Sequence, residues 1–545
     1  MAEPKQLGEF LQDAGIVTQE QINVALSVQK VQQGFLGEIL EDLDFVTPLQ
    51  TAQAIAVQQS LDFVDIEDII IDPKVLQLVA KEIAFSKKIL PLFIENSELV
   101  VAAFDIKDIA TKDYLTKAAN MPIKYVVCDK NKLASMIELH YYQLEHPIEA
   151  RIESMLCSEL DCEDVDVIRL LDLVINNAIK DRATDIHITP DKSVVHIFFR
   201  IDGVLKHYYA FGKRLHAKIV ARIKILSQLD IAEQRLPQDG GLSHQFLDQD
   251  YDLRISTLPT NQGENVVIRI LSQSASLLDL ASLGIDSEQI QMLKSYFSKP
   301  YGMVLIAGPT GSGKTTTLYS ALREINALAK NVLTVEDPIE YKFSFIKQTQ
   351  INLKAGYDFS KAIRHFMRQD PDVMLVGEIR DHETAELAVR ASITGHLVLS
   401  TLHTNSAVGT IPRLLDMGVS QDLIATSLLA VVAQRLVRKL CLHCREAVDI
   451  NSEVLGVDTH ETMSIYKAKE GGCKLCRHTG YHGRIAIIEI LPIDASLKKM
   501  ISSGLSTYEV LSHTENTGMK TMRMSGLKRV IEGVTSLEEL DRVTL

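Results

Sequence analysis

Near the middle of the chain the sequence reads Gly308-Pro309-Thr310-Gly311-Ser312-Gly313-Lys314-Thr315. This run matches G-x-x-x-x-G-K-[ST] at every fixed position. The apolar residues 303–307 before it predict a buried parallel strand, and residues 316–328 after it predict a helix. In such a loop the backbone N–H groups surround phosphate oxygens, Lys314 reaches the β- and γ-phosphates, and Thr315 ligates Mg²⁺. The sequence therefore predicts a nucleoside triphosphate site that comprises this loop and Thr316.

The bulk composition is that of a soluble multidomain protein. Of the 545 residues, 46% are hydrophobic and 23% are charged. A length of this size predicts about three or four domains. The formal net charge of -14 argues against broad binding to nucleic acid, which depends on Lys and Arg. The most apolar candidate for a spanning helix, 423–437, is short and interrupted by polar residues, and the N-terminus does not resemble a signal peptide. We expect a cytoplasmic protein without a membrane span.

Residue periodicity divides the chain into four segments. Residues 1–143 hold a helical and then an α+β pattern, and residues 144–164 are polar and acidic, which predicts a linker. Residues 165–295 predict an α/β domain with helices at 165–181 and 215–229, a turn at Asp202-Gly203, and strands at 185–188, 194–200, 251–257 and 265–271. In 296–545 the alternation of strands with helices indicates a parallel sheet covered on both faces, and the predicted strands are 304–307, 332–336, 373–377 and 397–400.

Carboxylates follow two of these predicted strands, at the edge where ligands of parallel sheets bind. Glu336 and Glu340 lie at and after the end of the second strand and are candidates for polarising an attacking water. Glu378 follows the third strand and is a candidate for acting on Mg²⁺, directly or through water. ATP hydrolysis needs both functions, so the pattern favours a hydrolase.

Two C-x-x-C pairs lie near the C-terminal end, Cys441 with Cys444 and Cys473 with Cys476. Four thiolates in a tetrahedron suit a closed, structural Zn²⁺ site. Two copies of the motif favour a metal over redox chemistry. His443 and His478 are alternative ligands that could substitute for a cysteine.

The N-terminal region contains a repeat, because residues 6–29 align with residues 35–58. Each copy predicts two short helices, with Thr18 and Thr47 as N-caps of the second helix. On physical grounds alone, the repeat is a duplicated helical hairpin that packs or docks.

Four boxes of the sequence resemble, in order and spacing, those of the secretion ATPases that power type II secretion and type IV pilus machines: 308–316, 336–340, 377–381 and 394–404. The resemblance covers about residues 165–545. It implies an α/β, multidomain chain with a RecA-like parallel-sheet ATPase core, a preceding α/β (PAS-like) domain and a helical/α+β N-terminal domain. It also implies that Glu340 is the catalytic base and Glu378 the Walker B acid. His396 and His403 would then sense the γ-phosphate.

The same resemblance assigns arginines and partners. Arg254 and Arg269, in the domain before the core, resemble the arginine fingers of the family. Arg364 and Arg368, four apart on a predicted helix, resemble further arginines near the subunit interface. The family is hexameric, which implies a homo-hexamer whose fingers act in trans and whose partner is an inner-membrane platform protein with its associated components. A tetracysteine zinc element in this family marks assembly and secretion motors, which favours extension.

The N-terminal repeat resembles the cyclic-di-GMP-binding module of certain pilus ATPases, notably that of the mannose-sensitive haemagglutinin pilus. The resemblance implies a site at Leu7, Gly8, Leu11, Gln29, Leu36, Gly37, Leu40 and Gln58. Gln6 and Phe35 stand where the pattern has arginine, Asp44 replaces a glycine and Thr51 a leucine. Loss of both arginines removes charged contacts to phosphate or guanine. Cyclic-di-GMP binding and docking to a platform protein are therefore alternative uses of this region.

The leading hypothesis is a cytoplasmic, hexameric ATPase that uses Mg²⁺-ATP to power type IV pilus or type II secretion assembly. A nucleic-acid motor, conjugation-type or helicase-like, is the alternative, and the acidic balance and the tetracysteine element argue against it. A nucleotide-binding adaptor that does not hydrolyse ATP is a third reading, and the intact Lys314, Thr315, Glu340 and Glu378 disfavour it.

Overall fold

The structure, a computed structural model, describes residues 6–104, 109–157, 165–272, 279–451, 462–504 and 507–544. Contacts within the chain define two compact units. One comprises Met1–Gln19 with Pro48–Ala275, and the other comprises Glu20–Thr47 with Ser276–Leu545. None of the helices in the described ranges combines the length and the apolar character that a bilayer crossing requires.

Both copies of the N-terminal repeat form two short helices, as the sequence predicts. The first helices are α1 (Leu7–Asp13) and α3 (Leu36–Asp42), and the second are α2 (Gln19–Gln29) and α4 (Pro48–Gln59). Each second helix begins directly after the threonine predicted as its cap, Thr18 or Thr47. A residue with left-handed backbone follows each first helix, Gly15 with φ 68° and Asp44 with φ 60°. The two copies therefore share one turn geometry, although only the first has the glycine that favours it.

An α+β module follows the repeat in the first unit. Its sheet has the order β1-β2-β3, with β1 antiparallel to β2 and β2 parallel to β3. Residues 99–103 of β2 are buried and form the centre of this core. The sequence predicts β2 and β3 but not β1. The elements are α5 (Pro73–Leu76), α6 (Lys81–Lys87), β1 (Ile89–Glu95), β2 (Glu98–Ala103), α7 (Ile109–Ala119), β3 (Ile123–Val127) and α8 (Lys130–Glu145).

Part of the segment predicted as a linker is helical, because residues 148–157 form α9 (Ile148–Cys157). Ile148 and Ile152 lie four apart on one face of α9 and are buried in a core shared with α10 (Val167–Lys180). This stretch therefore packs as part of the following domain. Residues 158–164 of the predicted linker lie outside the described residues.

The domain after α9 is built on an antiparallel sheet with the order β6-β5-β4-β9-β8-β7. Its core includes apolar residues of α10 and of α11 (His216–Leu226), which cover one face. The predicted turn at Asp202-Gly203 is confirmed, with φ 49° and 83°. The predicted helix 215–229 is shorter, because Gln228 turns left-handed and the Leu229 N–H caps the Lys224 carbonyl at 2.8 Å. The strands are β4 (Asp185–Pro190), β5 (Val194–Ile201), β6 (Val204–Gly212), β7 (Gln238–Phe246), β8 (Gln249–Thr260) and β9 (Gly263–Ser272).

The second unit contains a seven-stranded sheet with the order β12-β11-β13-β14-β10-β15-β18. The first six strands run parallel, and β18 pairs antiparallel with β15. The four parallel strands predicted from the sequence are confirmed. The apolar run 423–437 is split between helix α17 and strand β15, which the sequence did not reveal. The strands are β10 (Gly302–Ala307), β11 (Val332–Glu336), β12 (Lys347–Gln350), β13 (Val373–Val376), β14 (Leu397–Leu402), β15 (Leu428–Leu440) and β18 (Tyr481–Pro492).

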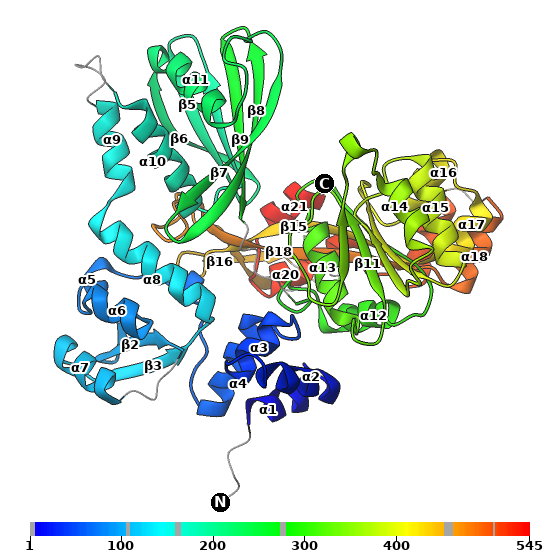
Figure 1. The fold of residues 1–545 in the computed structure, drawn as a ribbon, viewed down its shortest axis with the longest axis horizontal. Helices are drawn as coiled ribbons and strands as arrows, with labels where there is room; N and C mark the ends of the chain where they lie inside the picture. Colours follow the sequence, from blue (N-terminus) through cyan, green and yellow to red (C-terminus); the bar gives the residue numbers. More distant parts are fainter. Residues whose placement is uncertain are drawn as a thin grey trace, which may run out of the picture. The chain divides into compact units, whose positions relative to one another are not determined.

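Helices cover both faces of this sheet (Figure 1). Met303 and Leu305 of β10 point into one core, which includes α14, α15, α16 and α17, whereas Val304 and Ile306 point into the other, which includes α12 and α13. This alternation is the period of two expected of a strand buried on both sides. The helices are α12 (Ser287–Phe297), α13 (Lys314–Glu324), α14 (Phe359–Phe366), α15 (His382–Ile393), α16 (Thr410–Asp416) and α17 (Gln421–Ser427).

A small ribbon and four helices complete the second unit. β16 (Glu446–Asn451) pairs with β17 (Thr462–Lys467), and residues 452–461 between them are not described. The helices are α18 (Ala495–Ser502), α19 (Thr507–Asn516), α20 (Met522–Ile531) and α21 (Leu537–Thr544). The parallel-sheet core within a multidomain α/β chain confirms the predicted fold class.

Candidate nucleotide site and cysteine cluster

The glycine-rich loop connects the carboxyl end of β10 to the first residue of α13. Gly308, Gly311 and Gly313 all have positive φ, at 154°, 78° and 85°. A Cβ on Gly313 would lie 2.8 Å from the side-chain nitrogen of Gln434. A Cβ on Gly308 would lie 2.6 Å from the backbone carbonyl oxygen of Gln434. The loop therefore needs glycine for both its backbone angles and its contact with β15.

Lys314 is the first residue of α13 and lies folded over the loop. Its ammonium donates hydrogen bonds to the carbonyl oxygens of Gly308 at 2.8 Å and Pro309 at 3.0 Å. Burial lowers the pKa of Lys314, and the positive charge of Arg435 lowers it further, whereas Glu378 acts in the opposite direction. The loop thus holds a partly desolvated cation beside a helix N-terminus, an arrangement that favours a phosphate.

Gln434 of β15 supports the loop from below, and the sequence analysis missed it. Its side-chain NH₂ donates to the Ser312 carbonyl at 2.8 Å, and its side-chain oxygen accepts from the Thr317 hydroxyl at 2.7 Å. Gln434 is only 1% exposed and directly follows the apolar residues 428–433 of β15. A lone amide in such a run was the available signal, because a buried amide must find partners.

Glu378 follows β13 and lies at the same edge of the sheet as the loop. One carboxylate oxygen lies 2.5 Å from Nη2 of Arg380, and the other lies 3.6 Å from Nε2 of His403. The strand end is fixed by Thr401 of β14, whose hydroxyl donates to the Gly377 carbonyl at 2.7 Å. The structure therefore brings Lys314, Glu378 and His403 together from three neighbouring strand ends.

The two predicted histidines lie at opposite ends of strand β14. His403 follows β14, and burial together with the Lys314 charge lowers its pKa, whereas Glu378 acts in the opposite direction. His396 precedes β14, accepts the Gly302 N–H at its carbonyl at 3.1 Å and places its ring 2.9 Å from the Ala391 carbonyl. A six-residue strand, about 20 Å long, separates the two positions. Within this core His396 is not part of the nucleotide site.

The two candidate base residues after β11 have different surroundings. Glu336 is 3% exposed, and its carboxylate accepts from Tyr319, from the Thr334 hydroxyl and from the Gln348 amide. The Glu336 carboxylate is therefore occupied by hydrogen bonds within the core. Glu340 is exposed, and its backbone N–H donates to the Tyr319 hydroxyl at 3.0 Å. Of the two, only Glu340 presents a carboxylate to solvent, as a base that activates water requires.

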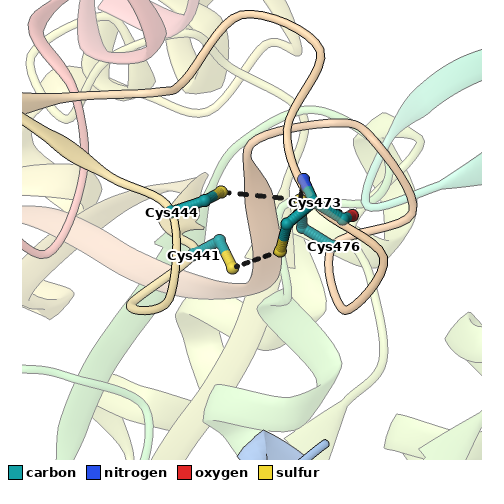
Figure 2. Close-up of side chains that lie close together, drawn as sticks. All are labelled: Cys441, Cys444, Cys473 and Cys476. Carbon is teal, nitrogen blue, oxygen red and sulfur yellow. Dashed lines mark hydrogen bonds between the residues drawn. The ribbon is translucent and has the colours of Figure 1, made fainter.

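The four cysteines of the two C-x-x-C pairs come together beside the end of β15 and the start of β18 (Figure 2). All four sulfur atoms lie within 4.8 Å of one another. Cys441 lies 3.7 Å from Cys473, Cys444 lies 3.8 Å from Cys476, and Cys473 lies 3.7 Å from Cys476. A tetrahedral site with Zn–S bonds of about 2.3 Å requires sulfur separations of about 3.8 Å. The donor set and its spacing therefore fit zinc.

Backbone donors around Cys476 favour its thiolate form. Burial opposes ionisation, but the N–H groups of Cys473 at 3.0 Å and Gly480 at 3.2 Å point at its sulfur, and its pKa falls to about 6. His478 is not aimed at the cluster, because its Nδ1 lies 3.1 Å from the Gly471 carbonyl. Among the described residues the cluster contains only the four cysteines.

The comparisons with known proteins agree on one family. Residues 161–542 match the model described as type II/IV secretion system protein, and residues 59–147 match the MshEN domain model. The chain is 36% identical to the type IV pilus assembly ATPase PilB of Myxococcus xanthus (strain DK1622) over 553 residues, which cover 98% of each chain. The chain belongs to the type II/IV secretion system protein family.

Further relatives are consistent with this membership. The type II secretion system protein E of Pseudomonas aeruginosa (strain ATCC 15692 and its synonyms) is 45% identical over 385 residues, covering 70% of this chain and 76% of that protein. The Legionella pneumophila ATPase DotB shares the fold, with a TM-score of 0.50 and 20% identity over 69% of this chain and 95% of that one. The predicted resemblance to secretion ATPases is thus confirmed, and the family does not favour a nucleic-acid motor.

The arginines that resemble family fingers lie in the first unit. Arg254 of β8 and Arg269 of β9 are directly opposite each other on the antiparallel pair. Arg269 pairs with Asp185 of β4 at 3.0 Å and is 55% exposed, and Arg254 is exposed as well. Two cations placed opposite each other repel, so an anion placed between them would relieve that repulsion.

Arg364 and Arg368 do not share a helix face as predicted, because α14 ends at Phe366. Arg364 forms an ion pair with Glu383 of α15. Arg368 lies beyond the helix end, where its guanidinium is 2.8 Å from Nδ1 of His365.

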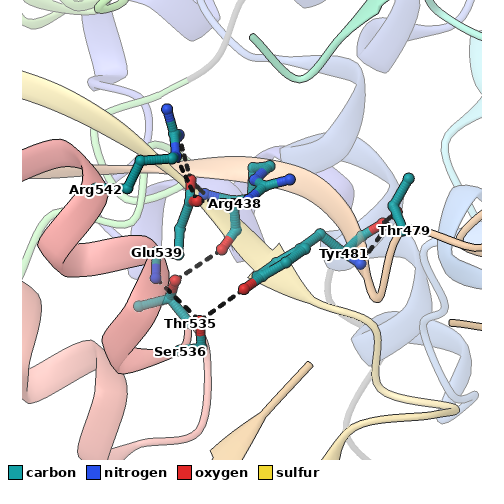
Figure 3. A network of polar contacts seen from close by, with 7 residues as sticks. All are labelled: Arg438, Thr479, Tyr481, Thr535, Ser536, Glu539 and Arg542. Carbon is teal, nitrogen blue, oxygen red and sulfur yellow. Dashed lines mark hydrogen bonds and ion pairs between the residues drawn. The ribbon is translucent and has the colours of Figure 1, made fainter. Parts of the chain in front are cut away.

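The buried carboxylate of Glu539 holds helix α21 against β15, one of the two strands beside the cysteine cluster (Figure 3). The side chain of Glu539 on α21 is fully buried and accepts from Arg438 of β15 at 2.7 Å and from Arg542 at 2.6 and 2.8 Å. Tyr481 stacks its ring under the Arg438 guanidinium at 4.0 Å and bonds Ser536 at 2.7 Å. Burial disfavours the ionised form of Glu539, but these arginine donors hold its pKa below the usual value.

The residues of the predicted cyclic-di-GMP site differ in accessibility. Gly8, Leu11, Gly37 and Leu40 are buried, so they contribute to packing. Leu7 and Leu36 are half-buried at the helix starts, and the Gln29 side chain donates to the Gly34 carbonyl at 2.9 Å. Gln58 is exposed, and Phe35, at a position where the pattern has arginine, is 79% exposed.

Proposed function

We propose that this chain hydrolyses ATP and works as a homo-hexamer that powers assembly and extension of a type IV pilus or a type II secretion pseudopilus. The observation that carries the proposal is the meeting of Lys314, Glu378 and His403 at one sheet edge behind the glycine-rich loop. Membership of the family and the names of its relatives support the same activity.

Each residue has a defined role in the proposed hydrolysis. The loop from Gly308 to Thr316 binds the phosphates through its N–H groups, and Lys314 neutralises their charge. Mg²⁺, held through Thr315 and Glu378, supplies charge stabilisation on the phosphates. Glu340, exposed at the edge with its N–H fixed by Tyr319, orients the attacking water. His403 donates a hydrogen bond toward the γ-phosphate.

The hexamer completes the site in this proposal. Arg254 and Arg269 act in trans as arginine fingers, and Arg364 and Arg368 lie near the subunit interface. The exposure of Arg254 and Arg269 and their directly opposite positions on β8 and β9 support this role, because Arg side chains bind phosphate through charge-assisted hydrogen bonds.

The four cysteines hold a structural Zn²⁺ in this proposal. Their sulfur spacing supports it, and a closed set of four thiolates leaves no position for substrate. The zinc element stabilises the end of β15, whose residue Arg438 also holds α21.

The N-terminal region docks to an inner-membrane platform protein and its associated components, which keeps the otherwise cytoplasmic motor at the membrane. Cyclic-di-GMP is the second candidate ligand. The MshEN domain match supports it for residues 59–147, outside the repeat that holds the candidate residues, and Gln6 and Phe35 in the two arginine positions weaken it. Calorimetric titration of the purified chain with cyclic-di-GMP, with ATP as the positive control, decides between them. Micromolar binding supports the dinucleotide, and no binding leaves docking.

One assay tests the central proposal. The purified chain is incubated with Mg²⁺-ATP, with and without single- or double-stranded DNA, and phosphate release is measured while native mass spectrometry reports the assembly. We expect hydrolysis by a hexamer that DNA does not stimulate. Absence of turnover would support a non-hydrolysing adaptor, and strong stimulation by DNA would support a nucleic-acid motor.

A further inference from the structure

The turn after α3 contacts the loop that follows β11, and both belong to the second compact unit. The Asp44 carboxylate accepts two hydrogen bonds there, from the Tyr341 hydroxyl at 2.7 Å and from the Ser344 N–H at 2.7 Å. Next to it the Phe45 and Phe345 rings stack with centroids 5.8 Å apart and 6° between their planes. The contact thus has a polar centre and an aromatic neighbour.

The backbone at Asp44 indicates that this contact is specific. Asp44 occupies the position in the second repeat copy that Gly15 occupies in the first, and both are left-handed. A residue with a Cβ is less favourable than glycine in this conformation. The first copy has glycine at this position. The second copy has a carboxylate that accepts from two donors, one side-chain hydroxyl and one backbone N–H. Hydrogen bonds to a charged group are stronger than those between neutral groups, so the two donors stabilise the left-handed turn at Asp44.

The charges around Asp44 are complementary. Arg323 of α13 is partly buried, and this burial lowers its pKa, whereas the negative charges of Asp44, Asp279 and Glu324 favour its charged form. A desolvated guanidinium needs such compensation. Asp44 is the member of this acidic group that comes from the N-terminal repeat.

A continuous set of contacts links Asp44 to the candidate base. The Tyr341 ring packs edge-on against Phe343 at 5.1 Å, and Phe343 packs edge-on against Tyr319 of α13 at 5.3 Å. The Tyr319 hydroxyl accepts the N–H of Glu340. Gln348 holds the loop between them, because it accepts from the Phe343 N–H at 2.7 Å and donates to the Tyr341 carbonyl at 2.9 Å.

We propose that the turn formed by Asp44 and Phe45 is an intramolecular docking element that holds the loop 341–345 and thereby positions Glu340. Asp44 is a positioning residue in this scheme, since it acts on Glu340 only through the loop. The effect on turnover rests on the proposed function, whereas the docking contact does not.

Docking is tested on the full chain without nucleotide, by amide hydrogen exchange followed by mass spectrometry. Asp44→Gly keeps the left-handed turn and matches the first repeat copy, but it removes the carboxylate. We expect exchange in the peptide containing residues 341–346 to accelerate about tenfold, because the Ser344 amide loses its acceptor. Glu20→Gln, which removes an exposed carboxylate from the same segment, serves as the matched control and should leave this exchange unchanged. Unchanged exchange in Asp44→Gly would overturn the inference.

Positioning is tested by steady-state kinetics of the same variants. Asp44→Gly should lower kcat by about threefold or more with KM for ATP unchanged, because the loop carrying Glu340 is no longer held. Asp44→Asn, which keeps one acceptor, should recover part of the loss. Faster exchange with an unchanged kcat would overturn the positioning role. A wild-type chain without turnover would contradict the proposed function, and the exchange measurement would still decide on docking.

Discussion

The nucleotide loop and the cysteine cluster lie in the same unit but are built differently. The loop depends on residues far apart in sequence, with Lys314 after β10, Glu378 after β13 and Gln434 within β15. The cluster joins two C-x-x-C turns, with Cys441 and Cys473 only 32 residues apart and all four sulfur atoms within 4.8 Å of one another. The first site depends on the order of the sheet strands, and the second depends on two turns that are closer in sequence.

This difference predicts how each site fails. A site at the edge of a parallel sheet loses function when one group is removed, while the buried sheet persists. A four-thiolate site loses its local structure with its metal, because metal binding and folding are coupled. The five predictions below run from the largest expected effect to the smallest.

Removing one cysteine should eliminate the metal site. Cys473→Ser should reduce zinc from about one ion per chain to near zero and unfold residues 441–451 and 462–480 locally, because structural zinc contributes about 10 kcal/mol or more to small sites. Metal content by mass spectrometry and exchange of these residues report the change. His478→Gln is the control, since the structure turns that ring away from the cluster. If Cys473→Ser kept its zinc but lost ATP binding, the nucleotide loop and the cysteine cluster would not be separate sites.

Replacing the candidate base should stop catalysis without unfolding. Glu340→Gln should lower kcat by about 100-fold to 1000-fold, because general base catalysis is worth that much, while the Kd for ATP stays within about threefold. Phosphate release and nucleotide titration measure the two quantities. Glu288→Gln, an exposed acid on α12 that pairs with Lys520, is the matched control. Wild-type turnover in Glu340→Gln would remove Glu340 from the mechanism.

Glu539 should matter for stability rather than for catalysis. Glu539→Gln should lower the free energy of unfolding by about 3 kcal/mol, because Arg438 and Arg542 lose their buried counter-ion. Chemical denaturation measures it, with the exposed neighbour Glu538→Gln as the control. The difference between the two variants should vanish if the pair contributes nothing.

The same residue predicts a pH dependence. The pKa of Glu539 is lower in the folded chain than the usual value of 4.5. Its contribution is therefore fully present above the unfolded pKa and is lost as the pH falls through the lower, folded pKa. Stability of the wild type should drop more steeply below pH 4.5 than that of Glu539→Gln, and parallel curves would contradict the assignment.

The smallest effect is expected beneath the nucleotide loop. Gln434→Leu leaves the Ser312 carbonyl and the Thr317 hydroxyl without their partner, which costs about 1–2 kcal/mol. We expect KM for ATP to rise about fivefold with kcat changed less, since the loop loses its support but not its catalytic groups. Thr426→Val, an exposed hydroxyl on α17, is the control. An unchanged KM would show that the loop holds its shape without β15.

Much of the fold was predictable because its signals are local. The strands 304–307, 332–336, 373–377 and 397–400 are apolar runs that end in polar residues, and the structure confirms them. The repeat helices followed from the aligned pattern. β12 was missed because an edge strand of polar residues, Lys347–Gln350, has no apolar signal. β15 was missed because it begins at Leu428 directly after α17 ends at Ser427, with no Gly or Pro turn between the two elements.

The sequence by itself determined the chemistry that is present: a phosphate-binding loop, four thiols in two pairs, and carboxylates at strand ends. These are set by residue type and short spacing, which need no tertiary information. Only the tertiary structure decided which groups meet. It showed that Glu336 is buried and Glu340 is exposed. It placed His396 and His403 at opposite ends of β14. It also brought Gln434 against the nucleotide loop and Asp44 against Tyr341. Such contacts join residues far apart in the chain, so they depend on sheet order and register, which no short stretch encodes.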